Sequence, residues 1–360
     1  MPTRHNFYKD FTKEYFLKKN KDLVSYKSIF RKKISRNQKI KYYYEILIDF
    51  ITKKISLNRM KISLLDKSNY FLNNLYQFED FYILLDDEYS KKQYIRYIVF
   101  RALNSSSRKL DTAIEDYSKE LLKIDKLKIE GYKNYYDLSN IGFNIKLLND
   151  PVSLMVTYVA EQYAYKNIVK VSEHDIVIDC GGATGDTALY FAAKKAKKVY
   201  IAEFIKSNIS IIKNQMANNL HYKDSLSIID HPLWSESNMI LSYKDCGNAS
   251  VVGEDGLYPN SVTSVTIDAM VIQNKISKVD FIKMDIEGAE VPALEGAMET
   301  IKNNKPKLAI CAYHKDNDLV KIPELIKKIN PNYKFYFDYY TDIGWEAVIY
   351  AIEPKHEKIN

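Results

Sequence analysis

The segment from Asp175 to Asp186 reads Asp-Ile-Val-Ile-Asp-Cys-Gly-Gly-Ala-Thr-Gly-Asp, and it predicts how the second half of the chain folds. Its apolar run, residues 176–178, has the length of a buried strand and ends in the carboxylate of Asp179. A turn with three glycines follows, and the apolar residues 187–193 predict a helix. Strand, glycine-rich turn and helix form the entry unit of nucleotide-binding α/β folds, in which backbone approaches a ligand closely.

The composition is that of an ordinary globular protein. The 360 residues suffice for two domains, 46% are hydrophobic, and the net charge of +7 is a mild basic bias. The three cysteines, Cys180, Cys246 and Cys311, have no metal or redox spacing and are too few for a disulfide framework. Because the first residues do not resemble a secretion signal and no apolar run approaches about 20 residues, we expect a cytoplasmic protein.

We expect a mostly helical N-terminal region over residues 1–150 and an α/β domain over residues 151–360. Residues 1–60 are rich in lysine and arginine, and residues 42–51 carry apolar side chains at helical spacing. Such a basic arm would suit the inner face of the cell membrane or, less favoured, nucleic acid. The alternative is a solvated helical face, which is what most charge runs on helices are. Residues 155–169 predict a helix leading into the α/β domain.

Seven strands are predicted in the α/β domain, at residues 176–179, 199–202, 226–229, 279–284, 307–311, 334–337 and 347–350. The first five alternate with helices, and the last two are joined by a short loop, which predicts an antiparallel hairpin. Residues 239–264 hold several glycines and predict short added strands. Five alternating units closed by a hairpin predict the Rossmann-like seven-stranded sheet of class I methyltransferases.

Four of these strands end in an acid, and the carboxyl ends of parallel strands meet at one edge of the sheet, where ligands bind. The acids are Asp179, Glu203, Asp230 and Asp285. Glu203 follows Asp179 by 24 residues, close to the spacing of about 20 for a carboxylate that accepts from ribose hydroxyls. One such acid is often only a helix cap, but four in register favour a ligand site.

The turn itself argues against a dinucleotide. Its glycines are Gly181, Gly182 and Gly185, which do not follow the G-x-G-x-x-G spacing. The flanking Asp179 and Asp186 would repel a pyrophosphate but attract the ammonium and sulfonium groups of S-adenosyl-L-methionine. We therefore expect S-adenosyl-L-methionine as the cofactor. Trp234, after the third strand, is a candidate to flank the adenine, although a core position is an equal alternative.

The acidic segment Asp285-Ile286-Glu287-Gly288-Ala289-Glu290 follows the fourth strand. Asp285 and Glu287 would face a substrate hydroxyl or a divalent cation such as Mg²⁺, for which nothing fixes a ligand set. His314 follows the fifth strand at the same edge. Because its unperturbed pKa is about 6.5, it is a candidate base for the hydroxyl proton, with Asp285 as the alternative.

With the glycine turn, the Asp-x-Glu-Gly-x-Glu segment, Tyr313-His314-Lys315 and the closing residues 345–351, the chain resembles the FkbM family of S-adenosylmethionine-dependent methyltransferases over roughly residues 170–353. The resemblance implies O-methylation, commonly of sugars in bacterial polysaccharides or of natural products. It assigns two sets of residues, the cofactor set Asp179, Gly181, Gly185 and Glu203, and the substrate-facing set Asp285, Glu287 and His314. Phe204 and Asp338-Tyr339-Tyr340 depart from the family pattern, where proline and Arg-His-Tyr are frequent.

The expected function is therefore O-methylation of a bacterial glycan or sugar precursor, lipid-linked or nucleotide-activated. The alternatives are a methyltransferase for nucleic acid or a natural product, a scaffold without catalysis, and an NAD-dependent oxidoreductase, which the glycine spacing disfavours. The sequence leaves the acceptor, metal dependence and oligomeric state open.

Overall fold

The computed structural model describes residues 4–20, 70–103, 117–254 and 256–354. The chain forms two compact units, Met1–Leu110 and Asp111–Asn360. Most of the expected basic arm, including its apolar face at residues 42–51, lies outside the described residues.

The first unit is helical. Its helices are α1 (Arg4–Asn20), α3 (Tyr70–Asn73), α4 (Leu75–Leu84) and α5 (Glu88–Ala102). Helix α1 packs on α4 and α5, and the Tyr82 hydroxyl donates to the Asp10 carboxylate at 2.8 Å. Asp87 ends the turn between α4 and α5 and caps α5 by accepting from the backbone N–H of Ser90 at 2.7 Å.

The second unit begins with α6 (Tyr117–Asp125) and the antiparallel strands β1 (Tyr135–Asp137) and β2 (Lys146–Leu148). Side chains of a later helix hold β2, because the amides of Gln215 and Asn219 donate to the carbonyls of Leu148 and Lys146, both at 2.8 Å. The strand pair thus packs with the α/β part of the chain, although the sequence grouped these residues with the N-terminal region.

The prediction of a helix over residues 155–169 is wrong beyond Val159. Helix α7 (Pro151–Leu154) continues only as the π-helical turn Met155–Val159. Glu161 then adopts a left-handed φ of 50°, and its carboxylate accepts from the Tyr190 hydroxyl at 3.0 Å and from Lys194 at 2.7 Å. This anchored reversal breaks the helix and places Tyr163 at the acidic edge of the main sheet.

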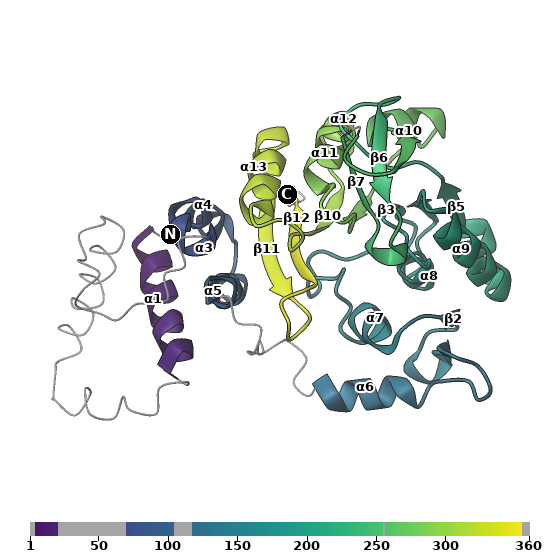
Figure 1. The fold of residues 1–360 in the computed structure, drawn as a ribbon, viewed down its shortest axis with the longest axis horizontal. Helices are drawn as coiled ribbons and strands as arrows, with labels where there is room; N and C mark the ends of the chain where they lie inside the picture. The colour runs from purple at the N-terminus through teal and green to yellow at the C-terminus, as the bar shows by residue number, and fades with distance from the viewer. Residues whose placement is uncertain (1–3, 21–69, 104–116, 255, 355–360) are drawn as a thin grey trace, which may run out of the picture. The chain divides into compact units, whose positions relative to one another are not determined.

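The main sheet has the predicted architecture. Its strands are β3 (Ile176–Cys180), β4 (Lys198–Ala202), β5 (Leu226–Ile229), β9 (Phe281–Met284), β10 (Lys307–Cys311), β11 (Lys334–Tyr339) and β12 (Ala347–Ile352). Their order is β11-β12-β10-β9-β3-β4-β5, and β12 is antiparallel to both neighbours (Figure 1). All seven predicted strands are present, and the closing hairpin is confirmed.

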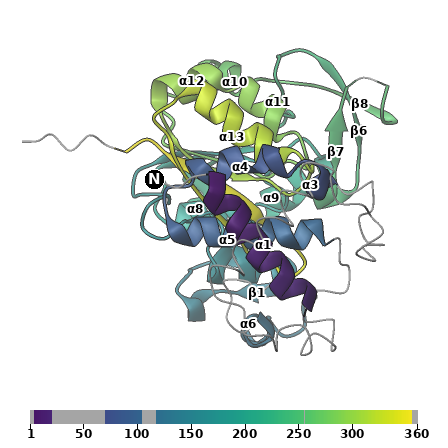
Figure 2. The same cartoon turned by 90° about the vertical axis from the view of Figure 1, so that its left-hand side faces the viewer.

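Helices cover both faces of this sheet. They are α8 (Asp186–Ala193), α9 (Lys206–Asn218), α10 (Ile267–Gln273), α11 (Glu290–Glu295), α12 (Met298–Asn304) and α13 (Asp318–Ile329). Helices α10 to α13 gather on one side of the sheet, and α8 lies on the other (Figure 2). Because both faces are covered, the central strands are apolar on both sides, and all four residues of β9 are buried, Lys283 among them.

A second, three-stranded antiparallel sheet forms from the glycine-containing segment after β5. Its strands are β6 (Ile240–Lys244), β7 (Val251–Gly253) and β8 (Asn260–Thr263), in the order β7-β6-β8. These are the added strands that the sequence predicts.

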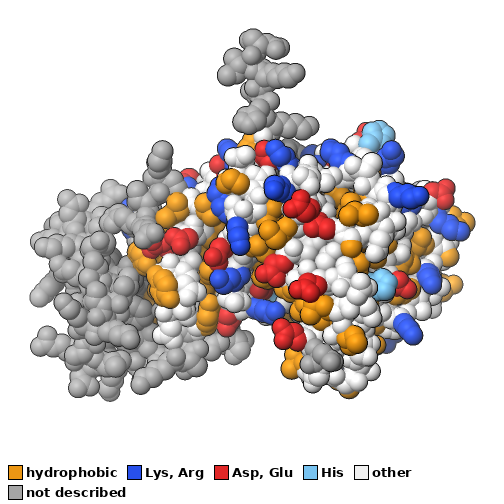
Figure 3. All heavy atoms as spheres, turned by 90° about the horizontal axis from the view of Figure 1, so that it is seen from above, with side chains coloured by type: hydrophobic (Ala, Val, Ile, Leu, Met, Phe, Trp, Pro, Cys, Tyr) orange, Lys and Arg blue, Asp and Glu red, His pale blue; other side chains and the backbone are white. Residues whose placement is uncertain are grey.

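The described surface carries charges of both signs. On the face drawn in Figure 3, basic and acidic side chains alternate over the coloured part of the surface. Within the described residues, every helix is too short or too polar to cross a membrane.

Candidate active site

The turn after β3 accepts only glycine at two positions. Gly181 has a φ of +81°, and a Cβ there would lie 1.9 Å from the carbonyl oxygen of Asp285. A Cβ on Gly182 would lie 2.1 Å from Cγ2 of Ile201. The turn therefore rests directly on the ends of β9 and β4, and its glycines serve this close packing.

Four backbone N–H groups of the turn are already bonded. Those of Gly181 and Gly182 donate to the carbonyl of Ala202 at 3.0 and 3.2 Å, and that of Gly185 donates to Gly182 at 2.6 Å. The N–H of Ala183 donates to the Glu203 carboxylate at 3.0 Å. These four N–H groups are therefore not available to a pyrophosphate, which agrees with the glycine spacing.

Glu203 directly follows β4, at the carboxyl edge of the main sheet. It is 7% exposed and accepts from the backbone N–H of Ile205 at 2.8 Å and the side chain of Asn208 at 3.3 Å, besides Ala183. Burial raises the pKa of this carboxyl, and the hydrogen bonds oppose the rise. Its carboxylate thus accepts hydrogen bonds from several neighbouring groups of the protein, which fix its orientation at the edge of the sheet.

Asp179 and Asp186 face the protein interior. An Asp179 oxygen lies 3.1 Å from Nζ of Lys283, and the other accepts from the Thr187 hydroxyl at 2.6 Å. The Asp186 carboxylate accepts from Thr184 at 3.1 Å, and burial raises its pKa to about 6. Neither side chain lines the pocket described next, and their assignment to the cofactor stays a prediction.

A pocket opens at the carboxyl edge of the sheet beside the turn. Its lining includes the predicted site residues Gly181, Glu203, Asp285 and Glu287, together with the segments 231–233 and 247–250. The latter segment belongs to the three-stranded sheet insertion, which sequence reasoning left without a role. Like Asp179 and Asp186, the predicted cofactor residues Gly182, Gly185, Asp230 and Trp234 do not line this pocket, and the Asp230 side chain is 77% exposed.

Asp285 sits at the inner end of the pocket. Its two carboxylate oxygens accept from the hydroxyls of Tyr163 at 3.0 Å and Tyr313 at 3.1 Å. Burial alone would raise its pKa, but the charges of Lys283 and His314 and the two tyrosine hydrogen bonds hold the pKa below its usual range. Asp285 is therefore ionised and already oriented.

Glu287 lies closer to solvent. Its backbone is left-handed, with a φ of 56°, and burial raises the pKa of its carboxyl to about 6. No described residue donates a hydrogen bond to this carboxylate, which leaves it able to accept one from a ligand.

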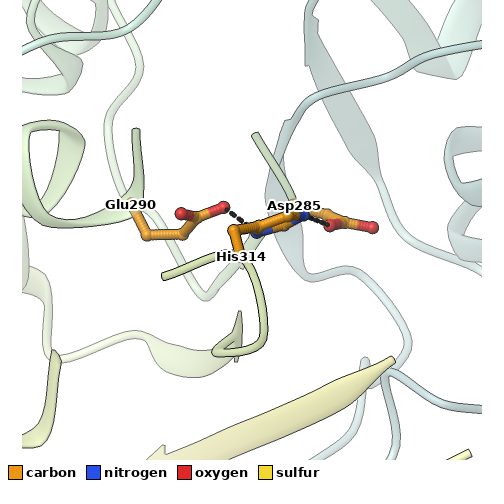
Figure 4. A group of neighbouring side chains, drawn as sticks. All are labelled: Asp285, Glu290 and His314. Carbon is orange, nitrogen blue, oxygen red and sulfur yellow. Dashed lines mark ion pairs between the residues drawn. The ribbon is translucent and has the colours of Figure 1, made fainter. Parts of the chain in front are cut away.

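Three carboxylates surround the imidazole of His314, which is 8% exposed. Its Nδ1 lies 3.0 Å from an oxygen of Glu290, and its Nε2 lies 3.5 Å from an oxygen of Asp285 (Figure 4). An oxygen of Glu287 also lies 3.5 Å from Nε2. None of these contacts is aligned as a hydrogen bond, so they act as ion pairs. Burial would lower the pKa of His314, but the carboxylates, Glu290 first, raise it to about 10. His314 is an imidazolium at neutral pH.

The same side chains include a candidate metal group. One atom each from Asp285, Glu290 and His314 lie within 4.8 Å of one another. However, Glu290 and Asp285 contact opposite nitrogens of the ring, an arrangement typical of a charge-paired imidazolium. A metal held by Asp285 and Glu287 stays a prediction.

Sequence reasoning missed several residues of this edge. Glu346 follows the closing loop with a left-handed φ of 57°, and its buried Oε2 has no hydrogen-bond partner among the described residues. Burial and the nearby Asp285 raise its pKa to about 8. The sequence shows neither the positive φ of Glu346 nor the contact of Tyr163 with Asp285, which are 122 residues apart. A lysine within an apolar strand, Lys283, is a visible signal of a buried charge.

The departure from the family pattern at residues 338–340 has a structural counterpart. Asp338, Tyr339 and Tyr340 are 5%, 0% and 4% exposed, and the Tyr340 hydroxyl lies 2.7 Å from that of Tyr350. These side chains fill the core beneath the hairpin.

The sheet order and the pocket at its carboxyl edge define a class I methyltransferase fold. Residues 179–335 match the model of the methyltransferase FkbM domain. This span contains the glycine turn and the acidic segment, and over it the chain is similar to the FkbM methyltransferase family. S-adenosyl-L-methionine is the methyl donor of this family.

A solved structure supports the assignment of the fold. The chain resembles methyltransferase FkbM from Methylobacillus flagellatus KT with a TM-score of 0.54 and 19% identity, over 78% of this chain and 59% of that one. It thus spans less than two thirds of that relative. A putative rRNA methylase from Clostridium thermocellum matches at a TM-score of 0.35 and 13% identity, over 54% of this chain and 94% of that one. Curated protein sequences gave no match.

Proposed function

We propose that the chain is an S-adenosyl-L-methionine-dependent O-methyltransferase that acts on a hydroxyl of a sugar or glycan precursor. The observation that carries the proposal is the acidic character of the pocket, where Glu203, Asp285 and Glu287 line a site beside the glycine turn. When bound, S-adenosyl-L-methionine supplies an electrophilic methyl group on a positively charged sulfur.

The charge balance favours a cationic ligand. Around His314, three carboxylates face one imidazolium, so two negative charges remain when all four groups are ionised. Uncompensated charge in a partly buried site is unfavourable, and a bound cation relieves it. Glu203, which also lines the pocket, is the acid that we propose for the ribose hydroxyls of the cofactor, from its place at the end of β4.

The proton acceptor in this proposal is Glu287, in place of His314. A charged imidazole has no lone pair to accept a proton, and His314 keeps its charge well above neutral pH. Glu287 lines the pocket, has a pKa of about 6 and is therefore ionised at pH 7. A base with a pKa near the working pH is efficient in proton transfer.

Asp285 and His314 then have positioning roles. Asp285, fixed by Tyr163 and Tyr313, accepts a hydrogen bond from the acceptor hydroxyl and aligns it for in-line attack. His314 holds the carboxylates of Asp285, Glu287 and Glu290 in one cluster.

The acceptor class comes from the family resemblance. A lipid-linked or nucleotide-activated sugar is the favoured acceptor, and the basic residues of the first 60 positions would suit an anionic membrane surface. Nucleic acid is disfavoured on the face of Figure 3, where acidic and basic side chains alternate.

The test compares surface glycans by mass spectrometry with and without the gene, and with the gene restored as wild type or as Glu287→Gln. We expect one methyl group on a defined sugar to disappear, to return with the wild type and not to return with Glu287→Gln. The methyl group should survive mild alkali, because an ether is stable under conditions that cleave a methyl ester. Unchanged glycans would contradict the acceptor class, and methylated RNA bound with a steep salt dependence would favour the nucleic-acid alternative.

A further inference from the structure

Lys283 is a buried cation directly beneath the cofactor turn. It lies in β9, paired in register with Asp179 of β3, and is 1% exposed. Its ammonium donates to the carbonyl oxygens of Gly181 at 2.7 Å and Cys180 at 3.3 Å. The Asp179 carboxylate, 3.1 Å away, compensates its charge. Burial acts to lower the pKa of Lys283, but the carboxylates of Asp179 and Asp285 raise the pKa by more than burial lowers it. The side chain is therefore charged.

These contacts fix the orientation of the peptides that begin the turn. The carbonyls of Cys180 and Gly181 are directed to Lys283, while the N–H groups of Gly181 and Gly182 are directed to Ala202 on β4. Gly181 is thus held from both sides at a left-handed φ, with the far side of the turn lining the pocket. Without the ammonium, two buried carbonyls would lose their charge-assisted partner.

Lys283 also reaches the acceptor side of the pocket. Its Nζ lies 5.3 Å from the centroid of the Tyr163 ring, a cation–π distance, and the Tyr163 hydroxyl donates to Asp285. One buried cation therefore contacts both the turn that would receive the cofactor and the tyrosine that orients Asp285.

We propose that Lys283 is a positioning residue that fixes the cofactor turn in its binding conformation through the carbonyls of residues 180 and 181. In this account Asp179 keeps Lys283 in place and has no contact with the cofactor. The inference rests on the proposed function, since it concerns the same cofactor pocket.

A purely structural ion pair makes a different prediction. If Lys283 only compensated Asp179, removing both charges together would restore stability and cofactor affinity alike. If Lys283 fixes the turn, the same double substitution restores stability but leaves affinity low, because the Gly181 carbonyl still lacks its donor. Stability and affinity therefore have to be measured on the same variants.

The experiment uses the full chain as Lys283→Met, as the double variant Asp179→Asn with Lys283→Met, and as the control Lys307→Met. Lys307 makes a comparable pair with Asp175 at 2.6 Å, with side-chain exposures of 17% and 13%, at the start of β10. The readouts are the thermal unfolding midpoint and the calorimetric Kd for S-adenosyl-L-methionine at pH 7.5.

We expect the double variant to unfold near the wild-type temperature and to bind S-adenosyl-L-methionine at least about tenfold more weakly. Lys307→Met should keep the wild-type Kd whatever its unfolding temperature. A folded double variant with a Kd within about twofold of wild type would overturn the role of Lys283. A wild-type chain that binds no S-adenosyl-L-methionine would instead refute the proposed function.

Discussion

Two clusters of buried charge lie a few residues apart in this domain, and they differ in balance. Beneath the turn, one cation and one anion, Lys283 and Asp179, are 2% and 0% exposed at their side chains. Around His314, one cation meets three anions, and two of these, Asp285 and Glu287, are 20% and 30% exposed. The balanced cluster is closed to solvent, and the unbalanced one opens into the pocket.

The difference indicates which charges are available to a ligand. Asp179 stands beside the glycines in the sequence, but its carboxylate forms an ion pair with Lys283 and accepts a hydrogen bond from Thr187. The excess negative charge lies with Asp285, Glu287 and Glu290, where the pKa of Glu287 is raised and that of His314 is raised further. A buried charge that is already paired supports the fold, whereas an unbalanced one at a pocket favours a ligand of opposite sign.

The largest effect is expected from Gly181→Ala. The new Cβ would lie 1.9 Å from the Asp285 carbonyl, which would push the two clusters apart. We expect affinity for S-adenosyl-L-methionine to fall at least about 100-fold, equivalent to about 2.7 kcal/mol, measured by calorimetry. Gly256→Ala is the matched control, with the same φ of +81° and nothing within 4 Å.

Gly256→Ala should lower stability by about 1–2 kcal/mol through backbone strain and leave affinity unchanged. Equal effects of the two substitutions on affinity would mean that close packing under Gly181 is irrelevant to the site.

Next in size is Glu287→Gln. Removing the proposed base should lower turnover about 10²- to 10⁴-fold with a folded protein, measured by methyl transfer at saturating cofactor. Glu324→Gln, on a side chain that is 62% exposed, is the matched control and should keep full turnover. If Glu287→Gln retained most of its turnover while His314→Gln lost it, the base would be His314 after all.

A smaller effect is expected in the pH dependence of stability. Folding raises the pKa of His314 from 6.5 to about 10, so the folded chain binds the proton more tightly than the unfolded chain. Its stabilising contribution is therefore complete below pH 6.5 and is lost as pH rises through 10. Denaturant unfolding of wild type and His314→Gln between pH 6 and 10 should show a stability difference that shrinks with rising pH. A constant difference would show that the three carboxylates do not hold the imidazolium.

The smallest effect is expected from Asp230→Ala. This acid ends β5 in the sequence pattern, yet its carboxylate is 77% exposed and does not line the pocket. Cofactor affinity should stay within about twofold of wild type, because no pocket contact is lost. A drop of tenfold or more would restore the role that the sequence predicts for it.

The regular parts of this fold could be predicted from sequence because each strand of the main sheet is a short apolar run, and four of the seven strands end in an acid. Glu203, Asp285, Glu287 and His314 meet at one edge because parallel strands bring their carboxyl ends together. The sequence does not predict which acidic side chain pairs with which basic side chain. The pairing of Asp179 with Lys283 depends on the register of β3 and β9, and the charge of His314 depends on three carboxylates at once. The reversal at Glu161 depends on contacts with α8, which no local pattern records.

The central claim is that the pocket beside the glycine turn holds a cationic cofactor and no dinucleotide. Its most direct test is calorimetric titration of the full chain with S-adenosyl-L-methionine and, separately, with NAD. The account predicts one S-adenosyl-L-methionine bound per chain and no heat of binding with NAD. Saturable binding of NAD, or no binding of S-adenosyl-L-methionine, would contradict it.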